Sequence, residues 1–313
     1  MSSHSILFDT PGPKARRRIL IFNVIGLLFA IGIVTWAVVQ LQQAGQLRAE
    51  LWTPLLDASA WTNFLLPGLQ NTLIAAALSI VLATVIGTLF GVGRLANSRV
   101  IRWICGVVVE FFRAVPVLIM MVAGWVLFSR MDFIPRSEAP LIAVVVALTL
   151  YNGAVIAELV RSGVHGLPKG QREAGLAIGM TRGKSIRYIE LPQALLAMLP
   201  SLVSQFVVIL KDSALGQIVT YPELLRQARL LGSRSPMPIL QTMLVAAIMF
   251  ILLNYALSKF AELAASRVST RTSGKTRLPN TPAQQVEVAA AHVAISQPPD
   301  LPNRPWQNPT NPN

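Results

Sequence analysis

The chain has 313 residues, of which 53% are hydrophobic and 13% are charged, and its mean hydropathy is +0.55. A soluble domain carries about a quarter charged residues, so the composition excludes an ordinary soluble protein and indicates a multi-span membrane protein. The net charge of +13 comes from short Lys and Arg clusters at the ends of apolar segments, which suits lipid headgroups and argues against nucleic-acid binding.

Six apolar segments follow one another along the chain. A helix needs about 20 apolar residues to cross a bilayer, and the segments that meet this length are 19–41, 68–92, 103–128, 139–160, 194–216 and 237–259. The first is longer than the roughly 7 to 15 residues of a signal-peptide core, so we expect a retained anchor. The fifth is the weakest, because Gln205 and Lys211 interrupt it. The prediction is an all-α integral membrane protein with about six transmembrane helices.

The Lys and Arg residues predict the orientation, because cytoplasmic loops are enriched in them. A basic cytoplasmic N-terminus (1–18) brings the loops near residues 94–102 and 161–193 to the same side, and the C-terminus with them. Arg226, Arg229 and Arg234 oppose this bias on the outer side. They belong to a segment with helical spacing of apolar residues, which predicts an amphipathic helix at the outer surface; its apolar residues are Leu224, Leu225, Ala228 and Leu231.

The C-terminal tail, residues 268–313, is rich in Pro, Thr, Asn and Gln. Such a segment buries too little apolar surface to offset its conformational entropy, so we expect a disordered cytoplasmic tail. The single Cys105 excludes an intrachain disulfide and a cysteine metal site. The histidines His4, His165 and His292 are too scattered to form a ligand cluster, and we expect neither a metal site nor catalytic residues.

The loop "KGQREAGLAIGMTRGKSIRYIELPQ", residues 169–193, contains the Gly-Lys-Ser of a nucleotide-binding P-loop at positions 183–185. That motif requires a glycine five positions before Gly-Lys and a strand before it. Ile178 occupies the glycine position, and no strand pattern precedes it. We therefore expect no ATP site in this chain.

The same loop has the pattern of two short helices separated by a break. Within 170–178 the small residues Ala174, Gly175 and Ala177 lie beside the apolar Leu176 and Ile178, and Gly179 permits the backbone that ends a helix. The second piece, Arg182 to Glu190, has Arg187 and Glu190 at a spacing that permits an ion pair, and Pro192 is expected to close it.

This run resembles the EAA loop of ABC-importer permeases, whose pattern is Glu-Ala-Ala, three residues, Gly, nine residues, Ile, one residue, Leu-Pro. The matching loop covers about 161–193, with Gly175 departing from the family's Ala. In that family the loop is the coupling helix that docks into the ATPase. The resemblance assigns ATPase coupling to Glu173, Ala174, Gly175, Gly179, Ile189, Leu191 and Pro192.

Stretches at 68–95, 109–121, 157–175 and 210–225 narrow the resemblance to the permeases for polar amino acid uptake, over about 65–262. The first span, 19–41, is additional to that core and resembles the glutamate-uptake branch of actinobacteria. The resemblance implies a type I fold with five core helices in a bacterial cell membrane. It also implies a second permease subunit, related or identical, and partner ATPases that hold ATP and Mg. The remaining partners are an extracytoplasmic binding protein and an amino acid. Glutamate is the expected substrate, followed by glutamine or aspartate and then basic amino acids.

Polar residues inside the spans are candidates for the pathway or its gate, because charges at membrane depth usually face a cavity or a partner. Glu110 and Arg113 share a helix face and are also able to satisfy each other; Glu158 and Arg161 repeat the spacing, and Arg161 also fits the membrane interface. The full candidate set is Asn71, Thr72, Glu110, Arg113, Glu158, Gln205, Lys211, Asp212 and Ser213. An alternative explanation for Lys211 and Asp212 is a position at the membrane interface. The uncharged candidates are alternatively explained by hydrogen bonds between helices.

Gly87 and Gly91 have the spacing of close helix packing, and Pro116 and Pro200 predict bends. Two other functions stay open. An ion-coupled secondary transporter often contains two internal repeats, which the sequence does not show clearly. A membrane scaffold with a cytoplasmic interaction loop would leave uptake intact when the chain is lost.

Overall fold

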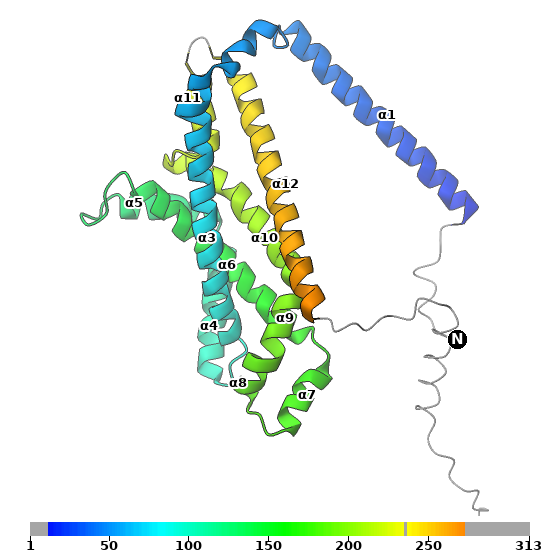
Figure 1. Cartoon of the computed structure of the whole chain (residues 1–313), viewed down its shortest axis with the longest axis vertical. Helices are drawn as coiled ribbons and strands as arrows, with labels where there is room; N and C mark the ends of the chain where they lie inside the picture. The colour runs from blue at the N-terminus through cyan, green and yellow to red at the C-terminus, as the bar shows by residue number, and fades with distance from the viewer. Residues whose placement is uncertain (1–11, 235–236, 273–313) are drawn as a thin grey trace, which may run out of the picture. The chain divides into compact units, whose positions relative to one another are not determined.

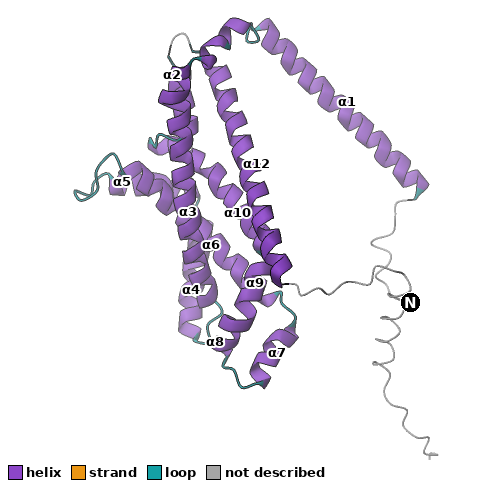
Figure 2. Cartoon of the chain, in the orientation of Figure 1, coloured by secondary structure: helices purple, strands orange, loops and turns teal. Residues whose placement is uncertain are grey.

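The computed structural model describes residues 12–234 and 237–272, and within those ranges every regular element is a helix (Figure 2). The chain divides into two units, Met1–Ala265 and Ser266–Asn313. The long helices are α1 (Pro13–Gln43), α3 (Leu66–Gly93), α4 (Arg99–Ala114), α5 (Val117–Phe128), α6 (Ala139–His165), α10 (Leu199–Asp212) and α12 (Ile239–Thr272) (Figure 1).

Five helical segments in the described residues are long and apolar enough to cross a membrane, and a sixth results if α4 and α5 count as one span. This agrees with the predicted number of spans, and the bend predicted at Pro116 is confirmed inside the third of them. α4 and α5 meet at 96°. The break lies before Pro116, where Val115 is extended, at φ −81° and ψ 127°. A residue before proline is pushed out of the helical region by the proline ring.

The core forms where α3 packs on α6, and glycines bring the two helices together. A β-carbon on Gly87 would lie 2.7 Å from the carbonyl oxygen of Gly153, and one on Gly91 would lie 2.7 Å from Val160 Cβ. The spacing of these glycines therefore serves helix packing, as predicted. Around this contact the buried core includes Ala75, Ala83, Met121, Val144, Leu148, Ile156 and Ile209.

α1 is apolar and exposed on every side, with Leu28 62% and Phe29 69% exposed. A helix that is hydrophobic all round and not covered by protein suits a lipid environment. Short turns follow it: η2 (Ala49–Leu51), η3 (Thr53–Leu56), α2 (Ala58–Ala60) and η4 (Trp61–Leu65). Gln241 on α12 donates a hydrogen bond to the carbonyl oxygen of Gln46, at 2.7 Å.

Between α6 and α12 the remaining elements are α7 (Lys169–Ala177), α8 (Arg182–Ser185), η5 (Ile186–Glu190), α9 (Leu191–Ala197), η6 (Ser213–Val219) and α11 (Leu224–Gly232). α11 is the predicted amphipathic helix, and it buries Leu224, Ala228 and Leu231. The helix α12 continues to Thr272, so the boundary predicted at 268 falls too early. The rest of the predicted tail, 273–313, and the first residues of the basic N-terminus, 1–11, lie outside the described residues.

Candidate functional site

The EAA-like loop contains α7, and Gly179 follows the end of this helix. Gly179 has φ +83°, a left-handed conformation that glycine adopts without steric cost. Its N–H donates to the carbonyl oxygen of Leu176 at 3.0 Å, and the N–H of Met180 donates to that of Gly175 at 3.1 Å. These two bonds form a Schellman motif, which satisfies the last carbonyls of the helix. The helix and break therefore lie where the loop pattern predicts them.

One side of α7 is buried and the other is free. Gly175 is buried, while Glu173 and Ala174 are exposed. A β-carbon on Gly175 would lie 3.0 Å from both Ile189 Cδ1 and Ser185 Oγ, so the departure from the family's Ala makes room for these neighbours. Ile178, the residue directly after α7, is 73% exposed. The loop thus presents a small, apolar tip that the chain itself does not cover.

The second half of the loop differs from the prediction. α8 passes through the wider turn η5 directly into α9, and Pro192 lies in the first turn of α9. Proline is tolerated there because first-turn N–H groups have no intrahelical partner, so it starts a helix and does not close one. Arg187 does not pair with Glu190. The buried Glu190 accepts a hydrogen bond from Ser185 Oγ at 2.7 Å, and Arg182 Nη1 lies 3.6 Å from its Oε1.

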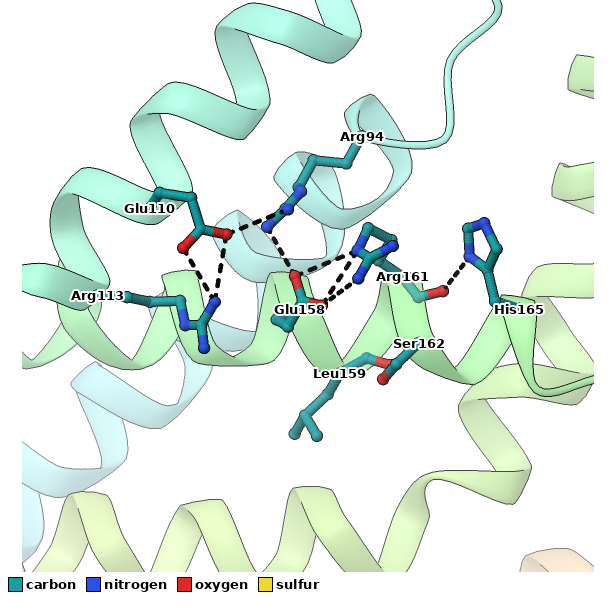
Figure 3. Close-up of polar contacts among 8 residues, drawn as sticks. All are labelled: Arg94, Glu110, Arg113, Glu158, Leu159, Arg161, Ser162 and His165. Carbon is teal, nitrogen blue, oxygen red and sulfur yellow. Dashed lines mark hydrogen bonds and ion pairs between the residues drawn. The ribbon is translucent and has the colours of Figure 1, made fainter.

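A network of five charged side chains lies where α3, α4 and α6 meet (Figure 3). Arg94, at the end of α3, is its centre. Arg94 Nη1 lies 2.7 Å from Glu158 Oε2 on α6, and its Nη2 donates to Glu110 Oε1 on α4 at 3.2 Å. One guanidinium group therefore joins three helices.

Each carboxylate of this network also contacts an arginine on its own helix. Arg113 Nη1 lies 3.3 Å from both oxygens of Glu110, and Arg161 Nε lies 3.1 Å from Glu158 Oε1. These are the two pairs that the spacing predicts. Arg94 is not among the predicted site residues, because an arginine at the end of a span looks like an ordinary interfacial cation.

The network differs in exposure from one end to the other. The side chain of Arg94 is 14% exposed and that of Glu158 is 25% exposed, whereas that of Glu110 is 58% exposed. Beside the exposed end, residues of α4 and α6 line a cavity of about 470 Å³ that opens to the surface. Glu110, Arg113 and Glu158 line it together with Tyr151.

The other pathway candidates do not converge on this cavity. Asn71 Nδ2 donates to the carbonyl oxygen of Pro222 at 2.9 Å, and Thr72 Oγ1 accepts from the N–H of Leu224 at 3.0 Å, so both hold α11 against α3. Gln205 donates to Asn152 Oδ1, between α10 and α6. Ser213 is buried and donates to the carbonyl oxygen of Leu210. Lys211 and Asp212 are the last residues of α10.

A buried carboxyl group, Glu223, caps α11. Its oxygens accept hydrogen bonds from the N–H groups of Leu225 at 2.7 Å and Arg226 at 2.6 Å. Burial raises the pKa of Glu223 to about 7 even though these hydrogen bonds lower it. Burial also raises the pKa of Tyr221 to about 12, and its hydroxyl donates to the carbonyl oxygen of Asn71. Among the described residues, no group of three or more His, Cys, Asp or Glu side chains is placed to hold a metal ion.

Comparison with known proteins gives a consistent result. The family described as "Binding-protein-dependent transport system inner membrane component" matches residues 83–270. The glutamate transport system permease protein GluD of Corynebacterium glutamicum is 41% identical over 270 residues, which cover 85% of this chain and 94% of that protein. The probable glutamine ABC transporter permease protein GlnP of Bacillus subtilis is 34% identical over 216 residues, 66% of this chain and 93% of that protein.

Solved structures share the fold. The crystal structure of an amino acid ABC transporter with histidines aligns with a TM-score of 0.59 at 25% identity, over 66% of this chain and 95% of that chain. The MetNI methionine ABC transporter in an inward-facing conformation aligns with a TM-score of 0.58 over 68% of this chain and 99% of that chain; at 20% identity this likeness shows the fold alone.

Proposed function

The chain belongs to the family of inner membrane components of binding-protein-dependent transport systems, and from this premise we propose that it is the permease subunit of an ATP-driven glutamate importer. The assignment of glutamate as the substrate rests on the 41% identity to a glutamate permease over 94% of that protein. Glutamine and aspartate are the next candidates, because relatives at lower identity are named for glutamine and for glutamate/aspartate transport.

The EAA-like loop is the part that couples this chain to a separate ATPase. Its exposed tip, with Ala174 and Ile178, is small enough to enter a cleft in a partner. α7 follows α6 after only three residues, 166–168, so a push on α7 reaches a helix that is two-thirds buried. The coupling residues are Glu173 to Gly179 at the tip, with Ile189, Leu191 and Pro192 supporting them from η5 and α9.

The remaining parts of the system follow from the family. Two permease subunits, identical or related, form the pathway in a bacterial cell membrane, with the EAA-like loop, the N-terminus and the C-terminus in the cytoplasm. Partner ATPases hold ATP and Mg, and an extracytoplasmic binding protein delivers the amino acid. ATP binding favours one conformation of the pathway and hydrolysis the other, so ATP shifts a two-state equilibrium.

Uptake of labelled glutamate by cells with and without the chain tests this proposal. Unlabelled amino acids serve as competitors, and vanadate and a protonophore are added separately. We expect chain-dependent uptake that glutamate competes best, that vanadate blocks and that survives the protonophore while ATP is maintained. Uptake competed best by another amino acid changes the substrate. Uptake that collapses with the proton gradient at constant ATP replaces the proposal with a secondary transporter.

A further inference from the structure

The cavity between α4 and α6 opens to the surface and is large enough for a small molecule. Its volume of about 470 Å³ lies within the roughly 300–1,000 Å³ of such sites. On α6, Tyr151, Val155, Glu158 and Leu159 line it from one helix face, and on α4 Glu110, Arg113 and Ala114 do so. The cavity thus combines an apolar wall, an aromatic ring and charges of both signs.

Its charges do not balance. The network beside the cavity holds three guanidinium groups, of Arg94, Arg113 and Arg161, and two carboxylates, of Glu110 and Glu158. One positive charge is left over, because arginine stays protonated in proteins. A ligand with one net negative charge would neutralise it.

The members of the network are not held equally well. Glu158 is partly buried and lies 2.7 Å from Arg94, whereas Glu110 is 58% exposed and its contacts to Arg94 and Arg113 measure 3.2 and 3.3 Å. These distances exceed the roughly 2.7–2.9 Å of strong charge-assisted hydrogen bonds. Glu110 is therefore the carboxylate that another carboxylate replaces most easily, and Arg113, 38% exposed, is the group it would reach.

We propose that this cavity binds an amino acid with a net charge of −1, and that a ligand carboxylate displaces Glu110 from Arg113. The released Glu110 carboxylate then accepts the ammonium group of the ligand. The exchange replaces one carboxylate on Arg113 with another, so the guanidinium never loses its counter-ion. This inference rests on the proposed function, and it names a site for the substrate within the chain.

The same charges predict selectivity. A neutral amide in place of the side-chain carboxylate leaves the excess positive charge in place, and a basic amino acid adds to it. An acidic amino acid is the class that removes it. Discrimination of this kind acts through the penalty of an uncompensated charge as well as through the contact itself.

The test is equilibrium binding of labelled L-glutamate to the complete transporter, this chain with its partner subunits, in nanodiscs without the binding protein. We expect saturable binding, at least tenfold weaker in Arg113→Gln because a hydrogen bond to a charged group is lost. Arg113→Lys should keep part of the affinity, and Glu110→Gln should weaken binding less than Arg113→Gln does, because it removes the competing carboxylate as well as the acceptor of the ligand's ammonium group. Arg99→Gln, an exposed arginine at the start of the same helix, is the matched control and should leave binding unchanged.

Several results would overturn the inference. One is binding within twofold of native in Arg113→Gln, and another is a Glu110→Gln variant that binds as weakly as Arg113→Gln. A third is the absence of glutamate binding to the native transporter. If, in addition, mass spectrometry recovers less phosphatidylglycerol from Arg113→Gln than from the native protein, the cavity binds lipid headgroups. Uptake by the same preparation in proteoliposomes with ATP and binding protein separates the two proposals. If the native transporter takes up glutamate and Arg113→Gln binds it with an unchanged binding constant, only the proposed substrate site is rejected. If the native transporter takes up no glutamate, the proposed function is rejected.

Discussion

Arg94 and Glu158 connect α3 to α6, with Nη1 and Oε2 2.7 Å apart. Glu158 lies two turns before the end of α6, and α7 starts just beyond that end. Arg94 reaches Glu110 on α4 as well. One guanidinium group therefore joins α3 and α4 to the end of α6 that precedes α7.

Removing Arg94 should weaken both stability and transport. In Arg94→Gln the carboxylates of Glu110 and Glu158 lose their shared cation, and we expect the free energy of unfolding to fall by about 1–3 kcal/mol, less than for a fully buried pair because Glu158 is partly exposed. Thermal unfolding of the purified protein measures this change. A double-mutant cycle with Glu158→Gln should give a coupling energy of about 1 kcal/mol or more. Additive effects of the two substitutions would show that the pair does not act as a unit.

Gly87 should not tolerate even alanine. Its β-carbon would meet the Gly153 carbonyl oxygen and Ile156 Cβ at 2.7 Å, and these atoms belong to the packed face of α6. Overpacking of this kind costs about 1–3 kcal/mol, so Gly87→Ala should lower the unfolding temperature.

Gly106 on α4 is the matched control, because a β-carbon there has nothing within 4 Å. Gly106→Ala should be neutral or slightly stabilising, since alanine is the better helix former. Equal unfolding temperatures for the two variants would contradict the close α3–α6 contact.

Much of the fold follows from local sequence. Apolar length predicts the spans, and the glycines of α3 predict its close packing. Local reasoning fails where the partner is distant. Arg94 meets Glu110 only because α3 and α4 turn back on each other, and nothing near Arg94 in the sequence indicates it. The helix end predicted at Pro192 is wrong for a different reason, since proline disfavours a helix interior but suits a first turn.

Gly179 is the position in the loop where the backbone conformation requires glycine. Proline fixes φ near −65° and cannot adopt +83°, so Gly179→Pro should destroy the end of α7. We expect loss of ATP-driven uptake with normal membrane insertion, measured by labelled substrate and by quantifying the chain in the membrane fraction. Ala174→Trp, which enlarges the exposed tip, should have the same effect.

Gly183 provides the control for that loss, because it lies in the same loop with a negative φ and open space at its β-carbon. Gly183→Ala should therefore transport normally. If Gly179→Pro retained native uptake, the tip of the loop would not be the coupling element.

Glu223 makes stability depend on pH. Burial raises its pKa from 4.5 to about 7, so between these values the folded protein binds a proton that the unfolded chain does not. The stabilisation is present below about pH 4.5 and is lost as the pH rises through about 7. At 1.36 kcal/mol for each pKa unit, the difference is about 3 kcal/mol at most. Glu223→Gln, which stays uncharged and still accepts one N–H of α11, should flatten the unfolding temperature over this window. A variant whose unfolding temperature follows the native pH profile would mean that other groups cause the dependence.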